Sequence, residues 1–269
     1  MVKKLFKHEF ASYLKLVLPV YIVLLGIASL VRFIYIFDNP FPAFTVVGVS
    51  SVLALVAACI VALVLIFVFV VIRFYKNLFT NEGYLTFTLP VTVSQHIWVK
   101  LITGFAYTLA TFGVIILSYC VATAGEVTIE TIKAGLYLFN EADANTDLNL
   151  VVYSIQYISN ILLSILSTYL TVYCSIAIGQ LSNKARIFVA IAVFIGWYFV
   201  GQICTTFIML FLVIVSPMDW FGDVMEYIYD NQALFAYTMS GLSMAFKVLL
   251  SALYYFVTHK IIKNKLNLE

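Results

Sequence analysis

The chain has 269 residues, of which 64% are hydrophobic and 10% are charged, and its mean hydropathy is +1.05. This composition leaves too little polar surface to cover a globule in water, so it excludes a soluble protein. The apolar runs approach the roughly 20 residues that a helix needs to cross a bilayer, and they lack the alternation of a membrane barrel. The sequence therefore predicts an all-α, polytopic membrane protein.

Residues 1–15 predict an amphipathic helix at the membrane interface. Apolar residues such as Leu5, Phe6 and Phe10 recur at helical spacing, and the lysines up to Lys15 supply positive charge. A helix of this kind lies on an anionic leaflet with its apolar face inward. A secretory signal peptide is the alternative, and the further apolar spans that follow argue against it.

Six transmembrane helices follow from the apolar runs, and residues 1–269 are expected to form a single transmembrane domain. The expected spans are 16–37, 50–72, 98–123, 150–181, 187–215 and 233–258. The four cysteines lie singly within these runs, so neither a metal site nor a disulfide framework is expected.

Residues 73–97 form a polar and aromatic stretch with net positive charge between the second and third spans. The Asn-Glu-Gly sequence at 81–83 and the proline at Pro90 interrupt any continuous span. Thr92 and Gln95 have the spacing of a capping box, in which each side chain satisfies a backbone donor at a helix start. A plain cytoplasmic loop, or a segment resting on the membrane surface, is the simpler interpretation of this stretch.

Two parts of the chain resemble ABC-2-type (type V) exporter permeases, especially the small Firmicutes-like ones. The loop after the second span of that family is similar to residues 74–101, FYKNLFTNEGYLTFTLPVTVSQHIWVKL, and the junction of the fourth and fifth spans is similar to residues 177–187, AIGQLSNKARI. The resemblance implies an N-terminal amphipathic connecting helix and a cytoplasmic coupling segment, here 73–97. It also implies two separate ABC ATPase subunits and a second permease subunit, identical or different.

No motif for catalysis is apparent, so the chain is not expected to be an enzyme. The phosphate-binding pattern GxxxxGK[ST] and the HExxH and GxSxG patterns are absent. No cofactor or metal is therefore expected in this chain, and the resemblance assigns ATP and Mg²⁺ to the partner ATPase subunits. The candidate contacts for coupling to the ATPase are Phe79, Glu82, Tyr84, Leu85, Phe87 and Leu89.

Charge is distributed unevenly among the segments that connect the spans. The N-terminal segment, the 73–100 loop, the 182–186 turn and the C-terminal tail hold most of the 15 basic residues, with only Glu9, Glu82 and Glu269 of the 13 acids. By the positive-inside rule, these segments and both termini face the cytoplasm. We expect a multi-pass protein of the bacterial cytoplasmic membrane, in contact with lipid and without a nucleic-acid partner.

One charged residue, Lys247, interrupts the sixth span near its middle. Facing lipid, its ammonium would cost about 2.5–3.5 kcal/mol on insertion scales. Polar residues recur around it at three- and four-residue spacing, and the fourth span carries a similar stripe. Such stripes either bond one helix to another or line a water-accessible route for a substrate. The candidate route residues are Lys247, Ser243 and Ser251 in the sixth span and Gln156, Asn160 and Ser164 in the fourth.

These features predict the permease subunit of an ABC exporter that moves an amphipathic substrate, such as a peptide, a drug or a lipid-like molecule. A gradient-driven secondary transporter is an alternative, although the predicted spans contain no carboxylate and no internal repeat. A non-transporting membrane scaffold or immunity protein is a third interpretation.

Overall fold

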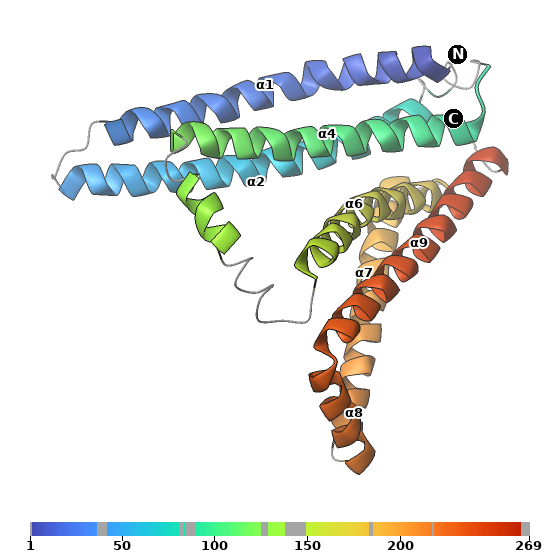
Figure 1. Cartoon of the computed structure of the whole chain (residues 1–269). Helices are drawn as coiled ribbons and strands as arrows, with labels where there is room; N and C mark the ends of the chain where they lie inside the picture. The colour runs from blue at the N-terminus through green and yellow to red at the C-terminus, as the bar shows by residue number, and fades with distance from the viewer. Residues whose placement is uncertain are drawn as a thin grey trace. The chain divides into compact units, whose positions relative to one another are not determined.

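The computed structural model describes residues 2–36, 42–80, 83, 90–124, 129–137, 149–182, 185–216 and 218–264. These residues contain helices and no strand, which confirms the predicted all-α fold. Six of the described helices are long and apolar enough to cross a membrane. They are α1 (Val2–Ile36), α2 (Pro42–Phe79), α4 (Val93–Ala122), α6 (Leu150–Gly179), α7 (Arg186–Val215) and α9 (Gln232–Asn264), shown in Figure 1.

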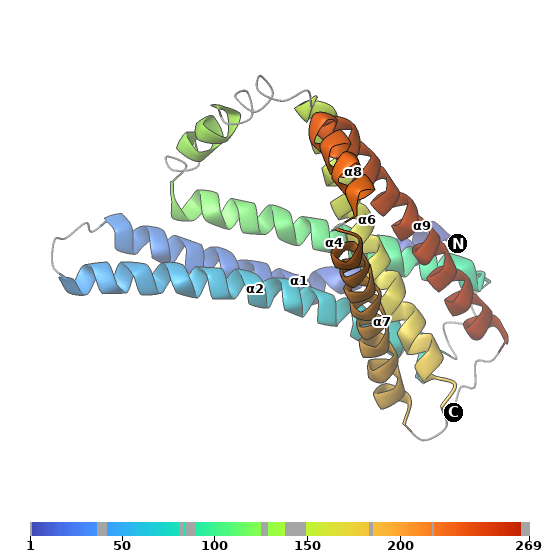
Figure 2. The ribbon, with the colours of Figure 1, turned by 90° about the horizontal axis from the view of Figure 1, so that it is seen from below.

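The helices form two compact units, and the first unit holds α1, α2 and α4. These three helices lie along one another in both Figure 1 and Figure 2. Glu9 of α1 bonds to Arg73 near the end of α2 and to Lys100 near the start of α4. At the other end of the bundle, Tyr35 of α1 lies against Gly48 near the start of α2. Consecutive helices are therefore antiparallel, and α1 and α4 are parallel.

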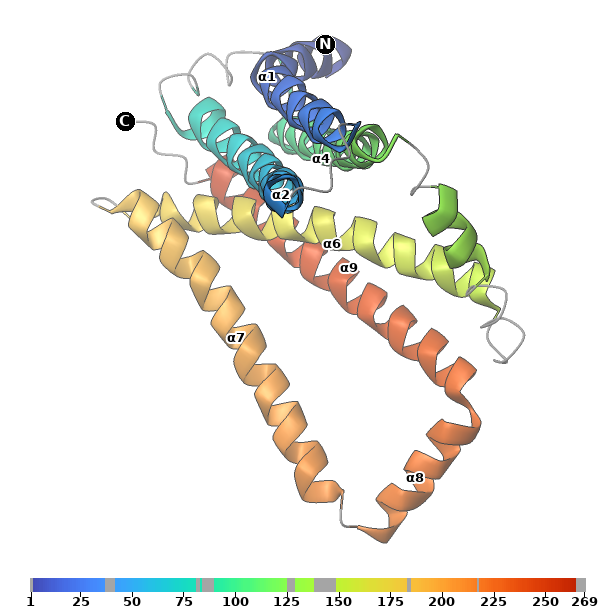
Figure 3. The same cartoon turned by 90° about the vertical axis from the view of Figure 1, so that its left-hand side faces the viewer.

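The second unit holds α6, α7, α9 and the shorter helix α8 (Asp219–Asp230), which connects α7 to α9 (Figure 3). α6 packs against both α7 and α9. α6 and α9 run parallel, since Gln156 bonds to Tyr237 near the start of both helices and Ser164 bonds to Lys247 further along. These contacts do not test whether residues 1–269 form a single transmembrane domain, so that expectation stays a prediction.

α1 is longer than its predicted span, because it begins at Val2 and includes residues 2–15, which were expected to lie apart on the membrane surface. Pro19 lies inside this helix. Glu9, Tyr13 and Val17 are buried, since their four-residue spacing places them on one face of the helix. The start of α1 is therefore part of the first unit's core.

The predicted coupling segment 73–97 is partly helical, because α2 enters it at one end and α4 at the other. α2 runs on to Phe79, since no Gly or Pro interrupts residues 73–79 and two of them, Phe74 and Leu78, are fully buried. The predicted capping box at the start of α4 is confirmed. The N–H of Gln95 donates to Thr92 Oγ1 at 3.4 Å, and the N–H of Thr92 donates to Gln95 Oε1 at 3.0 Å.

Two glycines allow helices to approach closely, one in each unit. A Cβ on Gly104 of α4 would lie 2.9 Å from Val70 Cγ1 of α2. A Cβ on Gly179, at the end of α6, would lie 2.6 Å from the backbone oxygen of Arg186 and 2.7 Å from Ala190 Cβ of α7. Real Cβ atoms do not come so near, so both contacts depend on the absence of a side chain.

The close approach at Gly104 predicts a cost for adding a single methyl group. In Gly104→Ala the new Cβ would overlap Val70, whose branched side chain has few alternative rotamers. We expect the free energy of unfolding to fall by about 1–3 kcal/mol, as overpacking does elsewhere. Thermal unfolding of the purified protein in detergent measures this loss.

Gly113→Ala is the matched control in the same helix, because nothing lies within 4 Å of its added Cβ. Val70→Ala shortens the side chain that the new Cβ would meet. The Gly104→Ala/Val70→Ala double variant should therefore lose less free energy of unfolding than the sum of the losses in the two single variants. Equal stability of the Gly104→Ala and Gly113→Ala proteins would show that α2 and α4 do not meet at Gly104.

Candidate functional site

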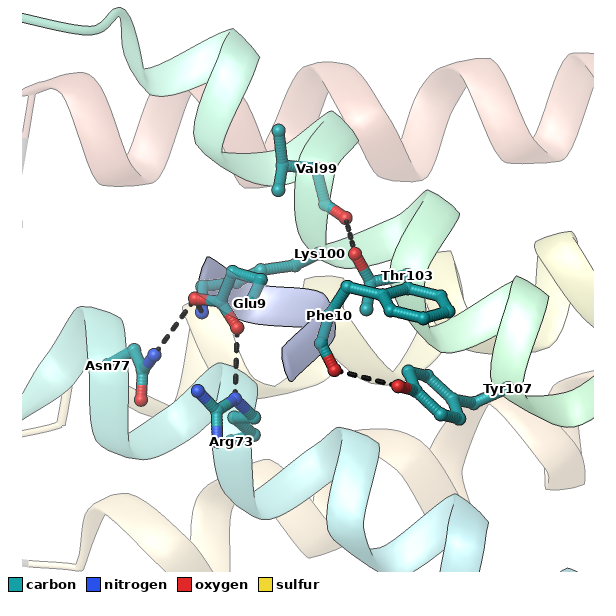
Figure 4. A network of polar contacts seen from close by, with 8 residues as sticks. All are labelled: Glu9, Phe10, Arg73, Asn77, Val99, Lys100, Thr103 and Tyr107. Atoms are coloured by element: carbon teal, nitrogen blue, oxygen red, sulfur yellow. Dashed lines mark hydrogen bonds and ion pairs between the residues drawn. The ribbon is translucent and has the colours of Figure 1, made fainter. Parts of the chain in front are cut away.

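A buried carboxylate joins the three helices of the first unit (Figure 4). Glu9 Oε1 accepts hydrogen bonds from Lys100 Nζ at 2.9 Å and from Asn77 Nδ2 at 3.0 Å, and Glu9 Oε2 accepts one from Arg73 Nε at 2.9 Å. The side chains of Lys100 and Glu9 are 2% and 6% exposed. We call Glu9, Arg73, Asn77 and Lys100 the Glu9 network.

The Glu9 network buries the Glu9 carboxylate and the Lys100 ammonium and leaves the Arg73 side chain 16% exposed. Removing these charges from water is costly, and charge-assisted hydrogen bonds of this length offset much of that cost. The Arg73 guanidinium carbon also lies 5.0 Å from the centre of the Tyr13 ring, within the range of a cation–π interaction. The network thus ties α1 to the end of α2 and to the start of α4.

Tyrosine hydroxyls continue the contact between α1 and α4 beyond the Glu9 network. Tyr107 Oη donates to the backbone oxygen of Phe10 at 2.7 Å (Figure 4), and the Tyr107 and Tyr13 rings stack with centres 5.4 Å apart. One helical turn further on, Tyr21 Oη and Thr111 Oγ1 lie 2.8 Å apart. These bonds satisfy hydroxyl groups that an apolar environment cannot solvate.

Most of the predicted coupling residues fall outside the described residues. These are Glu82, Tyr84, Leu85, Phe87 and Leu89. Phe79 is described: it is the last residue of α2, it is buried, and its ring centre lies 5.9 Å from that of Phe74. Phe79 therefore packs inside the first unit, so contact with a partner would have to come from the residues that follow it.

The predicted route residues of α6 and α9 lie against one another. Lys247 Nζ donates hydrogen bonds to Asn160 Oδ1 and to Ser164 Oγ, the latter at 2.7 Å. Asn160 Nδ2 in turn lies 3.5 Å from Ser243 Oγ. We call Lys247, Asn160 and Ser164 the Lys247 cluster. The two polar stripes expected from the sequence therefore face each other across the contact between these helices.

The other two candidate route residues lie along the same helices on either side of the Lys247 cluster. Gln156 Nε2 donates to the backbone oxygen of Tyr237 at 3.1 Å. Ser251 is 9% exposed, and the described residues provide no hydrogen-bond partner for its Oγ atom. The structure thus brings Lys247, Asn160, Ser164 and Ser243 together, with Gln156 and Ser251 further along. Their role as a substrate route stays a prediction.

The Lys247 ammonium differs from the Glu9 network because its partners are neutral. In the part of the chain that the structure describes, no carboxylate lies within ion-pair distance of Lys247. An ammonium has three N–H donors, and the described residues accept from two of them. Within membrane helices, charges of this kind usually face a bundle interior or a water-filled cavity, where they mark a substrate or ion pathway.

The sequence interpretation missed the Glu9 network because it placed residues 1–15 and the 73–100 loop at the membrane surface. A usable signal was present in the sequence. Tyr13 and Val17 belong to the apolar face of the first helix, and Glu9 lies four residues before Tyr13 on that same face. An acid in the middle of an apolar helix face indicates a partner of opposite charge within the protein.

The described residues contain no group of three His, Cys, Asp or Glu side chains that could hold a metal ion. All four cysteines are described, and all are free thiols. The Glu9 network and the Lys247 cluster, two groups of charged, hydrogen-bonded side chains, are the candidate functional sites.

Removing the Glu9 charge should destabilise the first unit. Glu9→Gln keeps the size of the side chain but leaves Arg73 and Lys100 without their carboxylate, and breaking a buried ion pair in this way typically costs about 3–5 kcal/mol. We expect a corresponding loss in the free energy of unfolding of the purified protein in detergent. Glu226→Gln on α8 is the matched control, because Glu226 is exposed.

Replacing one of the buried cations should recover part of the loss. In Glu9→Gln/Lys100→Met an apolar side chain takes the place of an ammonium that no longer has its carboxylate, so the double variant should be more stable than Glu9→Gln alone. A Glu9→Gln protein as stable as the Glu226→Gln control would contradict the role of Glu9 in joining the three helices.

Comparison of the chain with protein-family models, with curated proteins and with solved structures gives no match. The resemblance of residues 74–101 and 177–187 to ABC-2-type permeases therefore remains a prediction from sequence. Independently of that resemblance, the described part of the chain is helical, with six helices able to cross a membrane, and these helices carry the Glu9 network and the Lys247 cluster.

Proposed function

We propose that the chain is the membrane-spanning permease subunit of an ABC exporter, and that it moves an amphipathic substrate. The observation that carries this proposal is Lys247, a charged residue near the middle of a helix able to cross a membrane, with neutral partners on α6. Charged residues at this depth are rare, and they usually lie on the pathway of a substrate or an ion. A purely structural contact between α6 and α9 would not need a charge.

The energy source is proposed from the sequence resemblance. Two separate ATPase subunits would bind ATP and Mg²⁺ and would dock on the connection between α2 and α4. Geometry supports this assignment, because Arg73 of α2 and Lys100 of α4 both bond to Glu9 close to that connection. Movement of the connection would therefore be transmitted to α1 as well as to its own two helices.

The membrane orientation follows from charge. We place both termini and the connection between α2 and α4 on the cytoplasmic side of a bacterial cytoplasmic membrane. α8 then faces the other side, where its acids Asp223, Glu226 and Asp230 meet water and its exposed aromatic residues meet the membrane interface. Residues 201–214 of α7 are exposed and largely apolar, which suits contact with lipid. A second permease subunit, identical or different, belongs to the same proposal.

A gradient-driven transporter is the second candidate, and one observation favours it. Glu9 lies in a helix able to cross a membrane, although the spans predicted from sequence held no carboxylate, and intramembrane carboxylates often serve ion-coupled transport. Cations bond to both carboxylate oxygens of Glu9, which leaves it poorly placed to exchange an ion, so we rank this candidate second. A membrane scaffold or immunity protein would, like this transporter, need no ATPase.

Co-purification from native membranes distinguishes these candidates, because only the exporter requires a stoichiometric ATPase. In the Tyr84→Ala/Phe87→Ala double variant we expect loss of the ATPase, or ATP hydrolysis without transport, while membrane insertion stays intact. The reason is that aromatic residues at an interface commonly supply much of the binding energy.

Tyr227→Ala/Tyr229→Ala is the matched control, because these two exposed aromatics lie on α8, on the proposed opposite side of the membrane. The control protein should keep its ATPase. Wild-type protein that purifies without any ATPase would overturn the exporter proposal. A Tyr84→Ala/Phe87→Ala protein with its ATPase and full transport would overturn the coupling assignment alone.

A further inference from the structure

Hydrogen-bond donors without acceptors gather beside the middle of α9. Lys247 has a third N–H for which the described residues provide no acceptor, and Ser251, four residues later, is buried with an unpartnered hydroxyl. Trp197 of α7 has a buried indole N–H that likewise lacks a partner in the described ranges. The Trp197 ring meets the ring of Tyr254 edge-on, with centres 5.2 Å apart.

Lys247 and Ser251 lie along one face of α9, and Tyr254, which contacts Trp197 of α7, follows on that face. Lys247, Ser251 and Tyr254 follow one another at four- and three-residue spacing, so neighbouring positions are separated by about 4.5–6 Å along the helix axis. Buried polar groups normally have partners, and an unpartnered one in a native structure calls for a bound group or an ordered water. Here the Ser251 hydroxyl and the Trp197 N–H are buried without partners, and the nearby Lys247 ammonium is partly buried and positively charged.

A ligand that satisfies such donors must present acceptors and negative charge. Ionised carboxylates and phosphates have only acceptors, and their hydrogen bonds to an ammonium are about twice as strong as neutral ones. A cationic or purely neutral head group would leave the Lys247 charge uncompensated. The local chemistry therefore selects an oxyanion.

The surroundings of Lys247 suit an apolar chain attached to that oxyanion. Phe246 and Leu249, which lie around α9 away from the polar face that holds Lys247, are 60% and 69% exposed. In a helix that crosses a membrane, these side chains face hydrocarbon or another apolar surface. An amphiphile could place its head group at Lys247 and its chain along these residues.

We propose that the substrate carries an anionic head group, a carboxylate or a phosphate, which binds Lys247 directly, with the hydroxyl of Ser251 as an additional donor. This inference rests on the proposed transport function, because it names the class of substrate for the same site. It requires no ATPase, so it can be tested on the purified chain alone.

The test compares amphiphiles that share a twelve-carbon chain. Dodecyl phosphate, laurate and dodecyltrimethylammonium are titrated into the full-length protein in a neutral maltoside detergent, and binding is measured by calorimetry. We expect the wild-type protein to bind at least one of the two anions at least tenfold more tightly than the cation. Whichever anion binds more tightly identifies the head group as a phosphate or a carboxylate.

Variants assign the preference to Lys247. Lys247→Met should lose the tenfold preference for the anion, Lys247→Arg should keep it, and Lys263→Met, at an exposed position of the same helix, should leave it unchanged. Ser251→Ala should weaken binding of the anion by a smaller factor. Thermal unfolding of each variant identifies any that fails to fold.

The wild-type comparison needs no variant, so equal affinity for the anions and the cation would overturn the proposal even if Lys247→Met did not fold. An undiminished preference in folded Lys247→Met protein would also overturn it. Inorganic phosphate that binds as tightly as dodecyl phosphate would overturn the requirement for an apolar chain. Failure to recover an ATPase from native membranes would count against the exporter and not against this binding site.

Discussion

A charged side chain in a helix that crosses hydrocarbon must find its partners inside the protein, and this constraint accounts for the polar contacts of both units. In the first unit Glu9 takes its partners from α2 and α4, and two of them are cations. In the second unit Lys247 takes neutral partners from α6. The first arrangement joins three helices through opposite charges. The second joins two helices and leaves a positive charge that an additional anion would satisfy.

In the proposed function, the Glu9 network lies where movement of a docked ATPase would reach the helices of the first unit. Arg73 lies within the last two turns of α2, and Lys100 lies within the first three turns of α4. Helices are stiff over such short lengths, so the ends of α2 and α4 would move together with any partner docked between them. Because Glu9 of α1 bonds to both Arg73 and Lys100, α1 would move with the ends of α2 and α4. The contacts that Tyr107, Tyr13 and Tyr21 make between α1 and α4 would transmit this movement further along α1. An ATPase contact on the connection would thereby act on the whole first unit.

Local patterns in the sequence were sufficient to place the six long helices that the structure describes and to identify the polar stripes of α6 and α9. Apolar length and side-chain caps are local signals, so α6 begins at Leu150 and α7 ends at Val215 as expected. The polar stripes around Asn160 and Lys247 are also visible in the local sequence. The two stripes pair because polar groups in apolar surroundings are buried against each other. The Glu9 network is different, because Lys100 lies 91 residues from Glu9 and only packing brings them together. The length of α1 was missed for the same reason: charge favoured a surface segment, whereas tertiary contacts bury Glu9 and Tyr13.

The central claim is that α6 and α9 lie parallel with their polar faces together, so that Lys247 is held inside the protein. Cysteine cross-linking in membranes tests this claim most directly, in a background from which the four native cysteines have been removed. Asn160→Cys paired with Ser243→Cys should form a disulfide on mild oxidation, since Asn160 Nδ2 lies 3.5 Å from Ser243 Oγ and the two side chains face each other across the contact. Asn160→Cys paired with Leu242→Cys should not, because the Leu242 side chain is 66% exposed on a different face of α9. Equal cross-linking of both pairs, or cross-linking of the second pair alone, would contradict the account.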